Sequence, residues 1–193
     1  MAFGVPPAGT QYNSSDMSIL KVARMGHPVL RAKARPVDKA EIRSAAVQKL
    51  IDDMIDTMAE YHGVGLAAPQ VHEALRIFVA AIDDGEEDEG EVTPLALINP
   101  EITVVGADLV EDWEGCLSIP DVRGRVPRAR EIKVRAYDRR GDRLELRAHD
   151  FPARVIQHET DHLDGVLFFD RMRTFESLTF LDEYSRYWAK PND

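Results

Sequence analysis

Two histidines four residues apart could bind one metal ion. They are His158 and His162 in the stretch QHETDH, and Glu159 directly follows the first. On a helix, residues at this spacing lie on the same face about one turn apart, so both imidazoles can reach one cation while Glu159 projects beside it. The pattern predicts a metal site next to a catalytic carboxylate. The alternative is two histidines that make ordinary surface or core contacts of a helix.

A catalytic site of this kind needs a third protein ligand and an open position for water. In thermolysin-like peptidases this ligand lies downstream, where Asp164, Asp170 and Glu176 are available. The other candidate is Cys116, the only cysteine, in the stretch WEGCLSIP, because a thiolate is a strong ligand for zinc or ferrous iron. A buried apolar cysteine would look the same in the sequence, so spacing leaves the third ligand open.

The stretch GVGLAAPQ, residues 63–70, has glycines at the spacing of a dinucleotide-binding fingerprint. That fingerprint needs a strand before it and a helix after it, whereas here a helical pattern precedes and Pro69 follows, which disfavours nucleotide binding. Glycines can instead let the backbone pass close to a ligand, and Gln70 offers an amide N–H toward a developing negative oxygen. A tight turn after the helix would explain Gly63 but not Gln70.

The metal-binding pattern must be positioned by regular elements. A core helix is expected first, with Asp38 and Glu41 at capping-box spacing at its start and Gly63 at its end. A second helix, which carries QHETDH, is expected from an N-cap at Asp150 to a stop at Gly165. The apolar face of the first helix comprises Val47, Leu50, Ile51, Met54, Ile55 and Met58.

Runs rich in branched residues lie between these helices and predict half-buried antiparallel strands. They are LRIFVAAI from residue 75, LALINPEITVVG from 95, EIKVRAYD from 131 and DRLELRAHD from 142, and the turn RRGD joins the last two. A closing helix after a Thr174 cap is expected to pack on the sheet through Phe175, Leu178, Leu181, Tyr184 and Trp188.

Length and composition indicate one globular domain, since 193 residues with 44% hydrophobic and 30% charged residues can bury one core. No stretch is apolar enough to cross a bilayer, and the first twenty residues lack lysine and arginine, which argues against a secretory signal or an arginine-rich transit peptide. We therefore expect a cytoplasmic protein. One cysteine permits no intrachain disulfide, and the net charge of -10 argues against nonspecific binding to nucleic acid or anionic membrane.

Two segments are expected to lie outside the packed core. Residues 1–16 show no apolar periodicity and predict a flexible N-terminal extension. The stretch DDGEEDEGE, residues 83–91, has seven acids in nine residues and lies between two strand-like runs, which predicts a solvated loop.

Taken together, GVGLAAPQ, EGCLSIP and QHETDH, in that order with strands between them, resemble the three signature motifs of the peptide deformylases. The resemblance covers residues 18–188 and implies that residues 17–193 form the catalytic domain. It implies a compact single-domain α+β fold with antiparallel strands around a central motif-bearing helix, an N-terminal core helix and a C-terminal helix. The implied activity is removal of the formyl group from the N-terminal formyl-methionine of newly made proteins, with release of formate.

The resemblance also implies a role for each motif. A divalent metal ion would lower the pKa of a bound water and polarise the formyl oxygen, with ferrous iron as the active form and zinc as the alternative. Glu159 would serve as general base and then as general acid. The Gln70 side chain and the backbone N–H of Leu117 would stabilise the oxyanion. The implied metal ligands are Cys116, His158 and His162.

The implied substrate is an extended N-formylmethionyl nascent peptide, whose backbone pairs beside Gly63 to Gly65 and whose methionine enters an apolar pocket. Glu114 and Arg123 are expected either as an ion pair at the rim of the site or as independent surface charges. We expect a monomer in transient contact with the ribosome and without direct binding to nucleic acid or membrane. The candidate substrate-binding residues are Gly63, Val64, Gly65, Glu114, Gly115, Arg123, Phe151 and Val155.

Two other functions remain open on the sequence. A zinc endopeptidase would use the same histidines and Glu159 but would give Cys116 and Gln70 no task. A catalytically silent homologue would keep a structural metal and only dock at the ribosome exit, although the presence of Glu159 and Gln70 disfavours it.

Overall fold

In the part of the chain that the structure describes, six antiparallel strands surround the helix that carries QHETDH. The computed structural model describes residues 18–82 and 93–189. Five strands pair in the order β1-β2-β3-β4-β5, and β6 pairs with β4. Their bounds are β1 (Gly65–Ala67), β2 (Ile77–Ala80), β3 (Leu95–Cys116), β4 (Ile119–Tyr137), β5 (Arg143–His149) and β6 (Thr179–Phe180).

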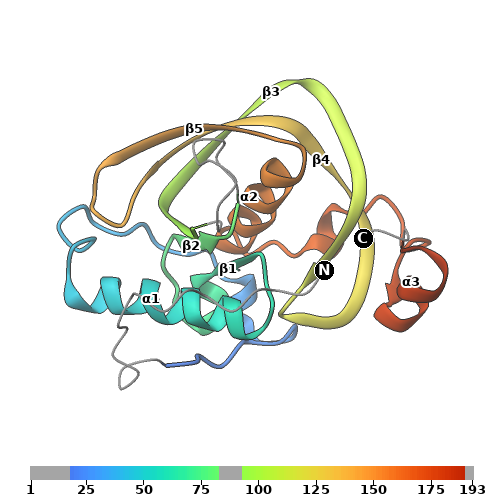
Figure 1. Cartoon of the computed structure of the whole chain (residues 1–193), viewed down its shortest axis with the longest axis horizontal. Helices are drawn as coiled ribbons and strands as arrows, with labels where there is room; N and C mark the ends of the chain where they lie inside the picture. The colour runs from blue at the N-terminus through green and yellow to red at the C-terminus, as the bar shows by residue number, and fades with distance from the viewer. Residues whose placement is uncertain (1–17, 83–92, 190–193) are drawn as a thin grey trace.

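Three α-helices lie around this sheet in the described part of the chain. In Figure 1, β3 and β4 form a long curved hairpin that arches over α2, with α1 near β1 and β2 and α3 beside β4. This arrangement confirms the predicted α+β fold, with antiparallel strands around the motif-bearing helix. The helices are α1 (Ala45–Glu60), α2 (Asp150–Leu163) and α3 (Leu181–Tyr187), and the 3-10 helices are η1 (Pro28–Arg31), η2 (Ala68–Val71) and η3 (Phe168–Arg171).

Strands β3 and β4 are much longer than the sequence predicted. The expected runs cover only the part of each strand that packs on the core, whereas the hairpin continues to a turn between Cys116 and Ile119. The distal part of β3 pairs only with β4 and has few buried residues, so its sequence lacks the alternation that marks a half-buried strand. The extended hairpin brings Cys116 next to α2.

The start of α1 differs from the prediction. Asp38 and Glu41 do contact each other, since the Asp38 backbone N–H donates to the Glu41 carboxylate at 3.2 Å, but they close a turn that precedes the helix. The helix begins at Ala45, where the Ser44 side chain accepts the backbone N–H of Val47 at 3.3 Å. The prediction of Asp38 as the cap was therefore wrong, because a serine closer to the apolar face satisfies the free amide.

The end of α1 also lies before the predicted glycine. The helix ends at Glu60, and His62 rather than Gly63 adopts the left-handed backbone, with φ of 54°. The Gly63 N–H then donates to the Met58 carbonyl at 2.8 Å, which closes the last turn. The predicted apolar face is buried, with Val47, Ile51, Met54 and Met58 in the core and Leu50 and Ile55 packed against it.

Helix α2 includes Asp150 in its first turn, and His149 rather than Asp150 is the N-cap. Gly165 follows the helix with φ of 72°, as predicted for its stop. The closing helix is shorter than expected, because α3 begins at Leu181 and Thr174 caps no helix. Trp113 of β3 contacts Tyr184 in α3 and Trp188 directly after it, with ring centroids 5.0 Å and 5.8 Å apart. These contacts hold α3 against the hairpin.

The core lies on both sides of β1 and β2. One cluster joins α1 to these strands, and a second joins α2 to β2, β3, β4 and β5 through Ile156, Phe78, Leu97 and Ile132 among others. Among the described residues, no helix is both long and apolar enough to cross a membrane. The predictions for residues 1–16 and for the acidic stretch 83–91 fall outside the described residues.

Candidate metal centre

The fold brings one cysteine and two histidines together. Cys116 ends β3, and His158 and His162 lie one turn apart on α2. One ligand atom from each lies within 4.8 Å of the others, and the Cys116 Sγ is 3.3 Å from the His162 Nε2. Cys116 and His162 are buried, and the His158 side chain is 11% exposed. The structure thus places the three predicted ligands at one point.

The downstream acids lie elsewhere. The Asp164 carboxylate pairs with Arg76 at 2.7 Å, and Asp170 pairs with Arg31. No downstream acid belongs to a cluster of three candidate ligands in the part of the chain that the structure describes. The geometry therefore favours Cys116 as the third ligand.

The donor set fits a borderline divalent cation such as zinc or ferrous iron, both of which accept thiolate and imidazole ligands. Burial alone would raise the pKa of the Cys116 thiol, but the charge of His162 and hydrogen bonds to both histidines outweigh it and hold this pKa well below its usual range. A thiolate at this position is the form that binds a metal.

Glu114 fixes the orientation of His158. Its Oε2 lies 2.9 Å from the His158 Nδ1, and Glu114 is buried. Burial raises the pKa of Glu114, but hydrogen bonds from Arg128 and His158 overcome this and hold it well below its usual range, so the group is a carboxylate. Because a carboxylate only accepts, the Nδ1 must donate, which leaves the Nε2 of His158 for a metal.

The expected ion pair between Glu114 and Arg123 was wrong, and so was the alternative of Glu114 as a surface charge. Glu114 is neither at the rim nor an isolated surface charge, since it pairs with Arg128 at 2.8 Å and with Arg154 at 2.7 Å. No ion pair joins it to Arg123 anywhere in residues 18–82 and 93–189. Arg123 instead lies over Gly115, where an added Cβ would overlap its guanidinium group.

Glu159 lies in the cleft beside the three ligands and is 4% exposed. Its Oε2 is buried and has no hydrogen-bond partner within the described residues. Burial raises the pKa of Glu159 to about 7, although the charges of His158 and His162 lower it. A carboxylate with a pKa near neutrality suits a general base that later returns its proton.

The Gln70 side chain points toward the ligand sulfur. Its Oε1 accepts the Ala67 backbone N–H at 2.8 Å, and its Nε2 donates to the Ser118 hydroxyl at 3.3 Å and to the Cys116 Sγ at 3.5 Å. The amide orientation is therefore fixed, with its donor side at the site. Leu117 lies in the turn after Cys116 and lines the same cleft.

A cleft of about 540 Å³ opens above these residues. All eight predicted substrate-binding residues line it, with Val64 47% and Phe151 57% exposed and Val155 buried. Sequence reasoning missed Tyr61 and Trp113, which also line the cleft. Tyr61 lies two residues before the motif GVGLAAPQ, and Trp113 directly precedes EGCLSIP. Their place next to these motifs could have indicated them from the sequence.

Four polar residues near the ligands were also missed. Ser118 and Asp161 lie inside the two ligand-bearing motifs, and Arg154 precedes His158 by four residues, so it shares its helix face. The sequence could therefore have indicated these three residues by their place in or near the motifs. Arg128 lies on β4 and meets the site only through the folded hairpin, so no local pattern marked it.

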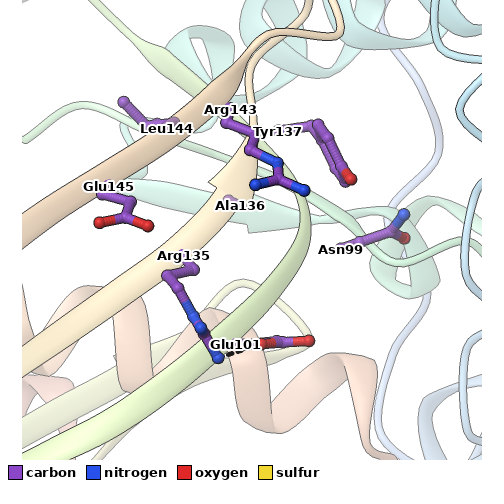
Figure 2. A pocket seen from close by; sticks show the side chains of 8 residues that line it. All are labelled: Asn99, Glu101, Arg135, Ala136, Tyr137, Arg143, Leu144 and Glu145. Carbon is purple, nitrogen blue, oxygen red and sulfur yellow. Dashed lines mark hydrogen bonds and ion pairs between the residues drawn. The ribbon is translucent and has the colours of Figure 1, made fainter.

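A second hollow, of about 350 Å³, lies on the outer face of the sheet (Figure 2). Its lining is strongly charged and includes the pair Arg135 and Glu101 at 2.9 Å, which are 68% and 70% exposed. None of the three candidate ligands lines it. The cleft at Cys116 is therefore the better candidate for catalysis.

Comparison with known proteins gives one consistent result. The family model for polypeptide deformylase matches residues 19–177. The chain is 42% identical to peptide deformylase 2 of Nostoc sp. over 174 residues, which covers 89% of this chain and 96% of the relative. It is 45% identical to the peptide deformylase of Halothermothrix orenii over 157 residues, which covers 81% of this chain and 95% of the relative.

Solved structures agree with the sequence matches. The peptide deformylase from Thermotoga maritima superposes with a TM-score of 0.72 at 41% identity, over 81% of this chain and 99% of that one. A class I type b peptide deformylase from Acinetobacter baumannii, solved with Met-Ala-Ser bound, has a TM-score of 0.74 at 38% identity, over 80% of this chain and 99% of that one. The matched region of the family model contains all three candidate ligands.

Proposed function

The chain belongs to the polypeptide deformylase family, and we propose that Cys116, His158, His162, Glu159 and Gln70 carry out the family's reaction. As a peptide deformylase, the protein is a metal-dependent hydrolase that removes the formyl group from the N-terminal formyl-methionine of newly made proteins. The observation that supports these residue roles is the convergence of one sulfur and two imidazoles within 4.8 Å, beside a buried carboxylate.

Cys116, His158 and His162 would hold the metal. When bound, a divalent cation supplies a Lewis acid that makes water more acidic and polarises the formyl oxygen. This mixed sulfur and nitrogen donor set suits both ferrous iron and zinc. We propose ferrous iron as the active form because the resemblance to the family implies it, with zinc as the alternative.

Glu159 accepts a proton from the attacking water as the water oxygen bonds to the formyl carbon. When the C–N bond of the formamide breaks, Glu159 donates this proton to the departing amine. The products are formate and a peptide with a free amino terminus. The buried position of Glu159 and its pKa of about 7 support both proton transfers.

Gln70 and Leu117 stabilise the negative charge that develops on the formyl oxygen. The Gln70 amide is oriented by its bond to Ala67, which points its two N–H donors at Cys116 and Ser118 in the site, and one of these two bonds is exchanged for a bond to the oxyanion. The backbone N–H of Leu117 adds a second donor from the turn that follows Cys116.

The peptide lies along Gly63 to Gly65, and its methionine side chain packs against Val64, Phe151 and Val155. These residues line one cleft with Glu159. The A. baumannii relative with bound Met-Ala-Ser supports a methionyl peptide as the ligand of this cleft. Arg123 and Gly115, which pack on each other at the cleft, complete the proposed binding surface.

The cellular setting follows from the substrate. We propose that residues 17–193 act as the catalytic domain of a cytoplasmic monomer that contacts the ribosome transiently, because formyl-methionyl chains emerge there. The family match over residues 19–177 supports these domain limits.

Formate release from formyl-Met-Ala-Ser tests the proposal, with protein purified without oxygen and loaded with ferrous iron. The parent should release formate, and Glu159→Gln should keep its metal content and fold while losing about 10²–10⁴-fold in turnover. A folded, metal-loaded parent that releases no formate would contradict the proposed roles. Cleavage of unformylated peptides would indicate an endopeptidase, and ribosome binding without formate release would indicate a silent homologue.

A further inference from the structure

A group of buried charges joins the β3–β4 hairpin to helix α2 beside the metal site. Glu114 precedes Cys116 by two residues on β3, and Asp161 is the neighbour of His162 on α2. Arg128 of β4 bonds both carboxylates: its Nε and Nη2 donate to Glu114 at 2.8 and 3.0 Å, and its Nη1 donates to Asp161 at 2.5 Å. One guanidinium group thus links the strand of the thiol ligand to the helix of the histidines.

Stability alone does not account for this arrangement. Glu114, Arg128, Arg154 and Asp161 are each at most 7% exposed. Buried ion pairs lose most of their attraction to desolvation, and apolar side chains of similar volume are often as stable or more stable. A role in fixing the positions of the metal ligands accounts for buried charges here.

Every acceptor position of Glu114 is occupied. Its Oε1 accepts from Arg128 and from Arg154 at 2.7 Å, and its Oε2 accepts from Arg128 and His158. The Glu114 carboxylate therefore has no freedom to rotate, and the His158 ring is fixed with it. Orientation of a ligating imidazole through its second ring nitrogen is a strong determinant of metal affinity.

Asp161 is fixed from its other side. Its carboxylate accepts from Arg171 at 2.6 and 3.1 Å, and the Arg171 side chain is half exposed. A continuous series of hydrogen bonds therefore runs from His158 through Glu114, Arg128 and Asp161 to Arg171 at the surface. Only a planar guanidinium group can pair with Glu114 through two nitrogens and with Asp161 through a third, which excludes lysine as an equivalent.

We propose that Arg128 is a positioning residue that fixes Cys116 on β3 relative to the two histidines on α2, and thereby sets the affinity of the site for a divalent ion. The inference rests on the ligand set given under the proposed function. It requires no contact between Arg128 and substrate, and it assigns a task to charges that the reaction itself does not use.

Cobalt(II) is the probe for this proposal, because its thiolate absorption reports Cys116 as a ligand and its affinity can be measured against a competing chelator. Arg128→Lys should bind cobalt about 10–100-fold more weakly than the parent and with altered thiolate absorption. The matched control is Arg76→Lys, which weakens the pair with Asp164 at the end of α2 and leaves Glu114 untouched. This control should bind cobalt as the parent does.

Thermal unfolding of the metal-free proteins separates positioning from general destabilisation. The proposal is overturned if Arg128→Lys binds cobalt as tightly as the parent, or loses no more affinity than Arg76→Lys. If Arg128→Lys does not fold, Asp161→Asn replaces it and should show a smaller loss in the same direction; parent-like affinity would overturn the proposal. A parent that binds cobalt through its thiolate but releases no formate with iron would contradict only the proposed function.

Discussion

Among single residues, Glu159 gives the clearest dependence on pH. Burial raises its pKa to about 7, and only the ionised form can accept a proton from water. The charge of a bound cation lowers this pKa, so kcat/KM should rise with pH through a midpoint at or below about 7 and should fall as acid protonates Glu159. The measurement is kcat/KM for formyl-Met-Ala-Ser across the pH range in which the protein stays folded and metal-loaded. A flat profile on the acid side would argue against Glu159 as the base.

Gly65 sets the position of the same carboxylate. A Cβ at this position would overlap the Glu159 side chain, which is buried and cannot move aside freely. Gly65→Ala should therefore lower kcat by about 100-fold, the cost of misplacing a catalytic group by about 1 Å, while metal content stays at the parent level. Steady-state kinetics with metal analysis would test this.

Gly124→Ala is the matched control for the glycine prediction. Its Cβ would meet the flexible end of the Met172 side chain and would lie 3.2 Å from the ring of Phe168, and none of these three residues lines the cleft. This variant should keep the parent kcat. An equal loss in both variants would show that the Gly65 effect is not specific to Glu159.

Among the elements, α1 allows a direct comparison of two cap residues. Ser44→Ala removes a side-chain acceptor for the Val47 N–H and should lower the free energy of unfolding by about 1 kcal/mol. Asp38→Ala keeps the backbone contact with Glu41 and should cost less than about 0.5 kcal/mol. Urea unfolding of both variants measures the difference, and a larger loss for Asp38→Ala would restore Asp38 as the cap.

The elements also show how far the sequence predicts the fold. Helix α2, the apolar face of α1 and the β4–β5 hairpin follow from local periodicity and turn residues, because each buries one face against the core. The distal part of β3 has few buried residues although α2 and α3 contact it, so its largely polar sequence gave no alternating pattern. The cap of α1 was misplaced because two chemically suitable starts lie within seven residues of each other.

The contacts of the metal site also fall into those that local sequence patterns predict and those that they do not. His158, Glu159 and His162 could be predicted as a unit because one helical turn brings them together. The meeting of Cys116 with that helix depends on the whole β3–β4 hairpin, and the pairing of Glu114 with Arg128 depends on the same register. Only the resemblance to a known family indicated the first of these contacts, and neither helical nor strand periodicity could indicate the second.

At the scale of the whole molecule, metal binding should stabilise the fold. The ligands come from β3 and α2, which are distant in the sequence, so a bound ion joins two parts of the core that separate on unfolding. An ion that binds only the native state at about 100 times its Kd adds about 2.7 kcal/mol. For a chain of this size that corresponds to a rise in Tm of about 5–10 °C.

Thermal unfolding with zinc or cobalt, compared with a chelator, measures this rise, and Cys116→Ser is the control that separates the site from other binding. The serine is nearly isosteric but a poor ligand for these ions, so the variant should lose most of the metal-dependent shift while its metal-free Tm stays close to that of the parent. The buried Cys116 lies between Gln70 and His162, both of which can bond a hydroxyl, so the substitution leaves no unpaired group. An equal shift in parent and variant would place the stabilising ion away from Cys116 and would contradict the role of the hairpin as the carrier of the third ligand.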